Sequence, residues 1–212
     1  MEFFNKKEEE KSSEPEPKEA GQMILPSDMR MLGLYGEVDE GRSLHAIGFL
    51  IDYSETKMLI PVDEKDPESE LVEVTPPIEM LISTPGGSAD DMFAIYDIMR
   101  VVREKCDIVT YGIGKVMSAG VLLLAAGTKG QRKIGKHCRV MIHSVVAGSA
   151  GSFHNLENEM SEIRNTQDAY IKALAKETNM TPSKIRKLVG KKVNIYLSAQ
   201  EAVELGIADI II

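Results

Sequence analysis

The sequence predicts an α/β protein with a largely parallel β-sheet. Between Ile78 and Ile142, short apolar runs alternate with helical segments, a pattern that favours right-handed βα units. The helical segment 89–103 has a single apolar face, whose residues recur every three or four positions: Met92, Ile95, Tyr96, Met99 and Val102. A hydrophobic content of 43% over 212 residues is enough for a sizeable core. We therefore expect one domain over residues 23–212.

The first 22 residues differ from the rest of the chain. They contain a charged run at 6–11 and the sequence Ser-Ser-Glu-Pro-Glu-Pro at 12–17, with hardly an apolar residue after Phe4. Such a segment cannot bury enough apolar surface to offset the entropy lost on ordering it. We expect residues 1–22 to form a disordered tail.

The domain begins with a predicted strand, Met31–Tyr35, and a predicted helix over residues 42–53. The apolar residues of this helix are expected to face the core: Leu44, Ile47, Phe49, Leu50 and Ile51. Residues 57–77 are rich in proline and acidic residues, which favours an exposed insertion. Within it, the pattern predicts a hairpin that pairs residues 58–60 with 71–74.

The remaining elements follow in order along the chain. The predicted strands are 78–82, 106–112, 131–134 and 139–142, and helices are predicted at 89–103 and 119–126. A long helix over 153–178 is expected to bury an apolar stripe: Leu156, Met160, Ile163, Tyr170 and Leu174. Thr181 and Pro182 open a short helix that ends near Gly190. A capping box formed by Ser198 and Glu201 predicts the start of the last helix, and Gly206 predicts its end. Residues 207–212 are predicted to form a strand.

Charge and composition exclude several classes of protein. A net charge of -8 argues against a nucleic-acid partner, which requires a basic face. No apolar run approaches the roughly 20 residues that span a membrane, and the first residues lack the plan of a signal peptide, so we expect a cytoplasmic protein. Cys106 and Cys138 have no His or Cys at metal-ligand spacing, which favours buried thiols in a reducing compartment.

The first candidate for chemistry is Ser118, at the junction between the β-rich run 108–113 and the helical run 119–126. A hydroxyl at the start of a helix lies near backbone N–H groups and the positive end of the helix dipole, which stabilise developing negative charge. Serine is also a preferred N-cap residue. The position alone therefore leaves both a nucleophile and a helix cap open.

Three other features are candidates for the same site. Gly86 and Gly87 lie in a turn, where the lack of side chains lets a ligand approach their amides, although ordinary turns also contain such pairs. His143 is the one histidine of four that ends a predicted central strand, a place where structural histidines also occur. Asn194 lies opposite the apolar face of the run 193–197, and a surface or turn asparagine fits there too.

Taken in order, these motifs resemble the proteolytic subunit of the Clp protease, over Met31 to Ile212. The matching motifs are S-T-P-G-G at 83–87, G-x-x-x-S at 114–118, L-L-A-A-G-x-K-G-x-R at 123–132, R-V-M-I-H at 139–143 and L-S-A-x-E-A-V-E-x-G at 197–206. Several ordered motifs with compatible spacing are far more specific than any one of them. They favour a catalytic role for Ser118 and His143.

The resemblance implies a crotonase-like ββα superhelix with a protruding handle helix. It also implies a serine endopeptidase that hydrolyses unfolded proteins or peptides without a metal or cofactor. In that reading Ser118 is the nucleophile, His143 the general base, and Asn194 occupies the position of the usual triad aspartate. The backbone amides of Gly87 and Ala119 would form the oxyanion hole.

The resemblance further assigns residues 147–178 to the handle region, which binds substrate as an added strand. Substrate-binding candidates are Gly86, Ser144, Gly148 and Gly151. The implied assembly is a homo-oligomer of stacked heptameric rings, with an AAA+ ATPase as a further partner. The segment that forms the axial loops in the family is not found, and the insertion at 57–77 is extra.

Four positions depart from the family pattern. Ala119 replaces a common methionine, and Ser144-Val145 replaces Gln-Pro. Asn194 can orient the histidine ring but cannot stabilise the imidazolium by charge. Two possibilities therefore stay open: a slow enzyme, or the use of another carboxylate such as Asp168.

A non-catalytic or weakly active ring subunit that assembles with an active partner is the main alternative. An acyl-CoA enzyme of the crotonase type is disfavoured because no carboxylate pair is found at acid–base positions.

Overall fold

A seven-stranded, mainly parallel sheet forms the centre of the computed structural model, which describes residues 29–63, 65, 69–191 and 193–212. The strand order is β1-β4-β5-β6-β9, while β7 pairs with β5 and β8 pairs with β7. Only the β7–β8 pair of this sheet is antiparallel. The predicted parallel α/β architecture is therefore confirmed. The strands are β1 Met31–Tyr35, β4 Ile78–Thr84, β5 Ile108–Met117, β6 Lys133–Ile134, β7 Arg139–Ile142, β8 Ile195–Leu197 and β9 Ile210–Ile211.

Strand β5 is longer than the pattern predicts. The predicted strand ends at Gly112, whereas β5 continues to Met117. Strand β4 pairs with residues 108–112 of β5 and again with Val116, β6 pairs with residues 111–112, and β7 pairs with residues 115–117. The pairing with β7, together with the Thr84–Val116 pair of β4, carries the strand past Gly114, which has φ 64°. Because of the extension, β5 runs directly into Ser118.

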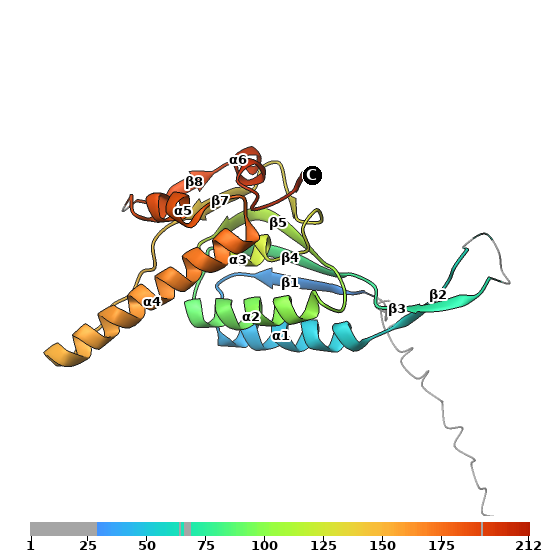
Figure 1. Ribbon diagram of the computed structural model, residues 1–212, viewed down its shortest axis with the longest axis horizontal. Helices are drawn as coiled ribbons and strands as arrows, with labels where there is room; N and C mark the ends of the chain where they lie inside the picture. The colour runs from blue at the N-terminus through green and yellow to red at the C-terminus, as the bar shows by residue number, and fades with distance from the viewer. Residues whose placement is uncertain (1–28, 64, 66–68, 192) are drawn as a thin grey trace, which may run out of the picture.

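Six helices surround the sheet in the described part of the chain, and none of them is both long and apolar enough to cross a bilayer. Helices α1 and α2 lie side by side beneath β1 and β4 (Figure 1). Helix α3 packs against α2, β5 and α4, and all its residues are buried. The helices are α1 Glu40–Glu55, α2 Ala89–Val102, α3 Ala119–Ala125, α4 Phe153–Glu177, α5 Pro182–Val189 and α6 Ala199–Glu204.

The predicted core face of α1 is partly wrong. The buried positions are Ser43, Ala46, Leu50 and Ser54. Leu44 is 73% exposed and Ile51 is 44% exposed. These two residues are seven positions apart and share a different face of the helix from the buried stripe. The helix also begins earlier than predicted, because the Asp39 side chain caps it by accepting the Arg42 N–H at 2.9 Å.

The apolar stripe predicted for α4 is buried only near the C-terminal end of the helix. Tyr170, Ile171 and Leu174 are buried, whereas Leu156 and Met160 are exposed. Figure 1 shows the reason: the first half of α4 extends away from the body of the protein. Periodicity identifies an apolar face, but it does not report how far along the helix a neighbour extends.

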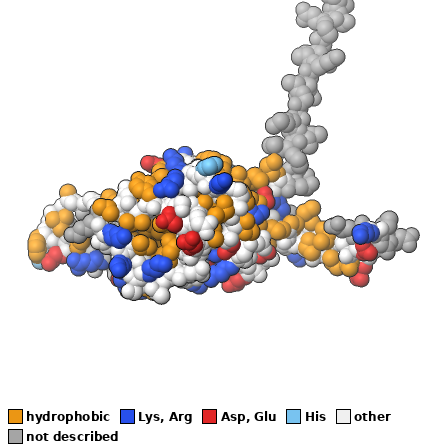
Figure 2. Space-filling view, turned by 90° about the horizontal axis from the view of Figure 1, so that it is seen from above, with side chains coloured by type: hydrophobic (Ala, Val, Ile, Leu, Met, Phe, Trp, Pro, Cys, Tyr) orange, Lys and Arg blue, Asp and Glu red, His pale blue; other side chains and the backbone are white. Residues whose placement is uncertain are grey.

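The predicted hairpin at 57–77 is confirmed. Strand β2, Met58–Pro61, pairs antiparallel with β3, Leu71–Val74. The hairpin projects from the opposite end of the protein to α4 (Figure 1). Its apolar side chains lie exposed along this arm, at the right of Figure 2. The tail predicted at 1–22 lies outside the described residues.

The two cysteines are buried free thiols, as predicted. Cys106 lies two residues before β5, and Cys138 lies directly before β7. Burial raises the pKa of the Cys138 thiol to about 11. At neutral pH the residue is therefore a neutral core side chain, since the reactive form of cysteine is the thiolate.

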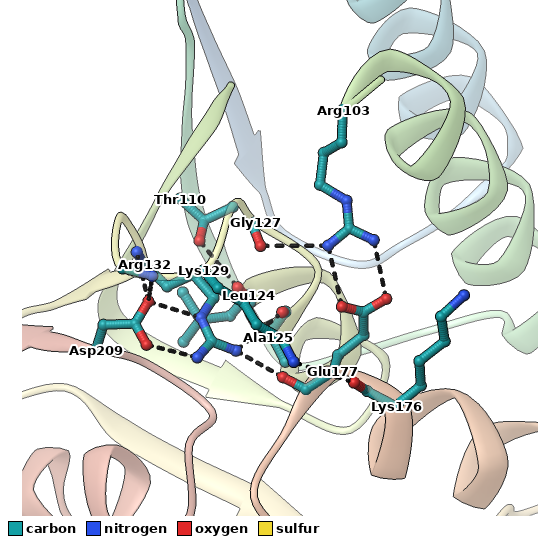
Figure 3. Close-up of polar contacts among 11 residues, drawn as sticks. Arg103, Thr110, Leu124, Ala125, Gly127, Lys129, Arg132, Lys176, Glu177 and Asp209 are labelled. Carbon is teal, nitrogen blue, oxygen red and sulfur yellow. Dashed lines mark hydrogen bonds and ion pairs between the residues drawn. The ribbon is translucent and has the colours of Figure 1, made fainter. Parts of the chain in front are cut away.

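A buried polar network fixes the C-terminal end of α4 (Figure 3). The Glu177 carboxylate accepts two hydrogen bonds from Arg103, at 3.0 and 2.9 Å, and one from the Tyr96 hydroxyl at 2.9 Å. Arg132 donates to the backbone oxygen of Glu177 at 2.6 Å and pairs with Asp209 at 2.5 Å. Burial alone would raise the pKa of Glu177, but the hydrogen bonds from Arg103 and Tyr96 outweigh it and lower the pKa. The network joins α4 to α2 and to the β6 region.

Glu177→Gln is expected to lower the free energy of unfolding by about 3 kcal/mol, because it leaves the Arg103 guanidinium without its counter-charge in a largely buried place. Urea denaturation measures this change. The matched control is Glu157→Gln on the exposed half of α4, where the loss should stay below about 1 kcal/mol. Equal losses for the two variants would contradict the role of the network.

Candidate active site

Ser118 has the one positive φ among the described non-glycine residues, with φ 52° and ψ -118°. It stands between the last residue of β5 and the first residue of α3. Although it occupies the N-cap position of α3, its side chain makes no capping hydrogen bond. A helix cap therefore does not explain this serine. A sharp strand-to-helix turn of this kind exposes a side-chain oxygen at the end of a sheet.

Ser118 lines a cavity of about 290 Å³ together with His143. The cavity walls come from the turn after β4, the start of α2, the turn before α3, the segment after β7 and the middle of α4. Gly87, Ala119 and Ser144 also line it. Residues from four separate stretches of the sequence thus meet at one hollow, because the turn after β4 leads directly into α2.

The turn after β4 approaches the serine closely. Gly86 is buried with φ 101°, and a Cβ atom added there would lie 2.5 Å from the Ser118 Cβ. Thr84 holds the turn, because its buried hydroxyl oxygen accepts the Gly86 N–H at 3.0 Å. Glycine is therefore required at position 86 both by its backbone conformation and by the space that Ser118 occupies.

Two backbone N–H groups border the cavity without a described acceptor, those of Gly87 and Ala119. Val38 bonds the residues on either side of Gly87, accepting from Ser88 and donating to Gly86 at 2.8 Å each. The Gly87 N–H consequently points away from Val38. The Ala119 N–H is free because the first residues of a helix have no intrahelical acceptor. The pair is suited to bind an oxygen that carries negative charge.

Strand β7 links the serine to the histidine. The Ser118 N–H donates to the backbone oxygen of Met141 at 2.8 Å. His143 follows two residues later, directly after the end of β7, and is half-buried. His143 lines the same cavity as Ser118, so the histidine and the serine meet at one hollow. A hydroxyl, an imidazole and two free amides around one cavity can support acyl transfer.

Asn194 lies at the edge of this arrangement. It precedes β8, where Ile195 pairs with Ile142, so the register continued by one residue brings Asn194 opposite His143. Its side chain is exposed and does not line the cavity, and no described hydrogen bond joins it to His143. Asp168 is not an alternative, because its carboxylate accepts from Arg186 at 3.2 Å on the exposed side of α4.

The glycines predicted to bind substrate divide into two groups. Gly86 contacts the serine turn, whereas Gly148 and Gly151 are exposed and lie outside the cavity lining. Both follow His143 in the segment that leads into α4. Ser144 directly follows His143 and lines the cavity. The structure thus brings most of the predicted residues together and leaves Asn194, Gly148 and Gly151 at or beyond the rim.

Helices α4 and α2 contribute side chains to the cavity that the sequence patterns did not indicate as site residues. Thr166 and Tyr170 of α4 and Met92 of α2 line it. Met92 and Tyr170 belong to predicted apolar stripes, which indicated burial in the core. The hydroxyl group of Tyr170, within an otherwise apolar stripe of α4, was the signal in the sequence that could have identified it as a residue of the site.

The sheet, its helices and the cavity define an α/β fold of mainly parallel strands, with the candidate site at the β5–α3 turn. Residues 68–212 match the model of the Clp protease family. This match covers well over half of the chain. The chain therefore belongs to the Clp protease family, which confirms the resemblance and the crotonase-like α/β fold that it implies.

Curated relatives agree with the family match. The chain is 39% identical over 137 residues to the ATP-dependent Clp protease proteolytic subunit 2 of Prochlorococcus marinus strain NATL2A, covering 64% of this chain and 66% of that protein. It is 35% identical over 135 residues to proteolytic subunit 4 of Rhodococcus jostii RHA1, covering 64% and 68%. Proteolytic subunit 1 of Prochlorococcus marinus subsp. pastoris is 34% identical over 154 residues, covering 73% of each chain. The alignments thus span about two thirds of these relatives.

Proposed function

We propose that the chain is a serine-type endopeptidase of the Clp proteolytic-subunit type. Ser118 is the nucleophile and His143 is the general base. The N–H groups of Gly87 and Ala119 bind the oxyanion, and Asn194 orients the imidazole. The observation that carries the proposal is the positive φ of Ser118, at a turn whose serine shares a cavity with a histidine and two free amides.

The chemistry proceeds in two halves. His143 accepts the Ser118 proton as the serine oxygen attacks the peptide carbonyl, and the two amides bind the oxygen that becomes negative. His143 then donates the proton to the leaving amine, and an acyl-enzyme remains. Water attacks this ester with the help of the same histidine and releases the second product.

The proposed substrates are peptides and unfolded proteins held in extended conformation. Residues 144–152 after His143 contain no helix or strand, and their backbone could pair with such a chain. The names of the relatives describe subunits of an ATP-dependent protease. We propose that the chain forms a cytoplasmic homo-oligomer of stacked rings, heptameric as the resemblance implies, with an AAA+ ATPase as partner.

The exposed position of Asn194 favours a second candidate, a weakly active ring subunit. A neutral amide at the rim of the site orients the imidazole less well than a buried carboxylate does, and the analogous Asp-to-Asn change in trypsin costs about 10⁴ in turnover. Such a subunit would assemble with a more active partner. Its rate should rise when a carboxylate is restored at position 194.

Incubation of the purified protein with a short fluorogenic peptide tests the proposed function. We expect slow hydrolysis that a fluorophosphonate abolishes, by a particle several times larger than the 23.4 kDa chain. Light scattering after size-exclusion chromatography measures the particle. A monomer that cleaves no peptide would contradict the proposal, whereas an assembled particle without cleavage would favour the non-catalytic subunit.

A further inference from the structure

The peptide bond between Ser118 and Ala119 is held by two neighbouring helices. Its carbonyl oxygen, which belongs to Ser118, accepts the Val121 N–H of α3 at 3.0 Å. It also accepts the hydroxyl of Tyr170 from α4 at 3.3 Å. The side chain of Tyr170 thus crosses from another helix to the backbone of the candidate nucleophile, 52 positions earlier in the sequence.

Tyr170 is suited to act as a fixed donor. Its side chain is 7% exposed and lines the cavity beside Ala119. Burial raises the pKa of the phenol, so the hydroxyl keeps its proton. The Glu177 network anchors α4 two turns further along the helix, which holds the tyrosine ring in place. A rigid donor of this kind restricts the group that it binds.

The planar geometry of the peptide bond gives this contact a consequence for the site. The Ser118 oxygen and the Ala119 N–H belong to one peptide plane, and in a trans peptide they point in opposite directions. A group that fixes the carbonyl oxygen therefore also fixes the direction of the N–H. The positive φ of Ser118 costs about 1–3 kcal/mol and persists only when surrounding contacts hold it.

We propose that Tyr170 is a positioning residue that orients the Ser118–Ala119 peptide and thereby aims the Ala119 N–H at the oxyanion. This inference rests on the proposed function, because it assigns the Ala119 amide to the transition state. Hydrogen bonding at the carbonyl also polarises the amide and strengthens its N–H as a donor. The hydrogen bond from Tyr170 therefore assists the step in which the carbonyl oxygen of the substrate becomes negative.

Tyr170→Phe tests the inference, because it keeps the ring and removes only the hydroxyl. The Ser118 oxygen retains its bond from Val121, so the variant should fold. We expect kcat for peptide hydrolysis to fall about 3- to 10-fold with KM unchanged, the range for the loss of one hydrogen bond. The affinity for a peptide aldehyde, whose adduct with serine carries an oxyanion, should fall in parallel.

The matched control is Tyr111→Phe, which removes another phenol hydroxyl, the one that donates to Glu79 at 2.8 Å, outside the cavity lining and the Glu177 network. This control should lower the melting temperature and leave kcat unchanged. A Tyr170→Phe variant with wild-type kcat, or with a raised KM alone, would overturn the inference. If the wild-type chain does not react at Ser118 at all, the proposed function fails instead, and the two failures are thus distinguished.

Discussion

Replacing Ser118 by alanine is expected to reduce peptide hydrolysis by at least about 100-fold, into the background of the assay. The serine oxygen forms the bond to the substrate in the proposed mechanism. Other hydroxyl groups line the cavity, but among the described non-glycine residues Ser118 alone has a positive φ. Loss of a triad nucleophile in other serine peptidases costs about 10⁶, and the remaining activity comes from binding and the oxyanion hole. Fluorogenic peptide cleavage measures the loss.

Ser198→Ala is the matched control for Ser118→Ala. Ser198 caps α6 in a reciprocal capping box, so its loss should cost about 1 kcal/mol of stability. Its turnover should equal that of the wild type. Ser118 makes no such cap bond, so its removal should leave stability nearly unchanged. If Ser118→Ala retains peptide hydrolysis and loses as much stability as Ser198→Ala, Ser118 is a helix cap and not the nucleophile.

The second large effect is expected from Asn194→Asp, which should raise kcat by about 10- to 1000-fold. A carboxylate opposite His143 would select the productive tautomer of the imidazole and stabilise the imidazolium that forms during attack. The register of β7 and β8, continued by one residue beyond the Ile142–Ile195 pair, brings position 194 across from His143, although the Asn194 side chain is exposed. This exposure is the reason for the wide range, since an exposed carboxylate is screened by water.

Two controls accompany Asn194→Asp. Asn155→Asp adds the same charge at an exposed position in the first turn of α4 and should leave kcat unchanged. Asn194→Ala removes the amide and should lower kcat below that of the wild type. If Asn194→Asp and Asn194→Ala both match the wild type, the residue does not orient His143, and the chain relies on a serine–histidine pair.

Local patterns predicted much of the fold. The N-terminal ends of α2, α5 and α6 were predictable because the side chains of Ser88, Thr181 and Ser198 cap these helices through hydrogen bonds within the first turn. The hairpin of β2 and β3 was predictable for a similar reason, since its two strands are close in sequence. Strand β7 was predictable because it is an apolar run with a polar residue at each end.

Distant pairing explains the errors in the fold. The extension of β5 depends on hydrogen bonds from residues 115–117 to β7, which lies more than 20 positions later. The exposed half of α4 reflects the absence of a packing neighbour within the described part of the chain. Strands shorter than predicted, such as β9, end where their parallel partner ends.

The candidate site was predictable where residue type and motif agree. Ser118, His143 and the Gly86-Gly87 turn were found through ordered motifs, and the structure brings them to one cavity. Tyr170 was not found, because its function depends on one hydroxyl that reaches a backbone oxygen 52 positions away. Its apolar spacing indicated a core residue, which is correct for the ring but not for the oxygen.

Covalent labelling distinguishes Ser118, the proposed nucleophile of this Clp-family chain, from every other serine. The native protein is treated with a fluorophosphonate, and the modified residue is located by mass spectrometry of its peptides. We predict one adduct per chain, on Ser118, that disappears when the protein is unfolded before treatment. No adduct under conditions that label a known serine peptidase, or an adduct on another serine alone, would show that Ser118 is not the nucleophile.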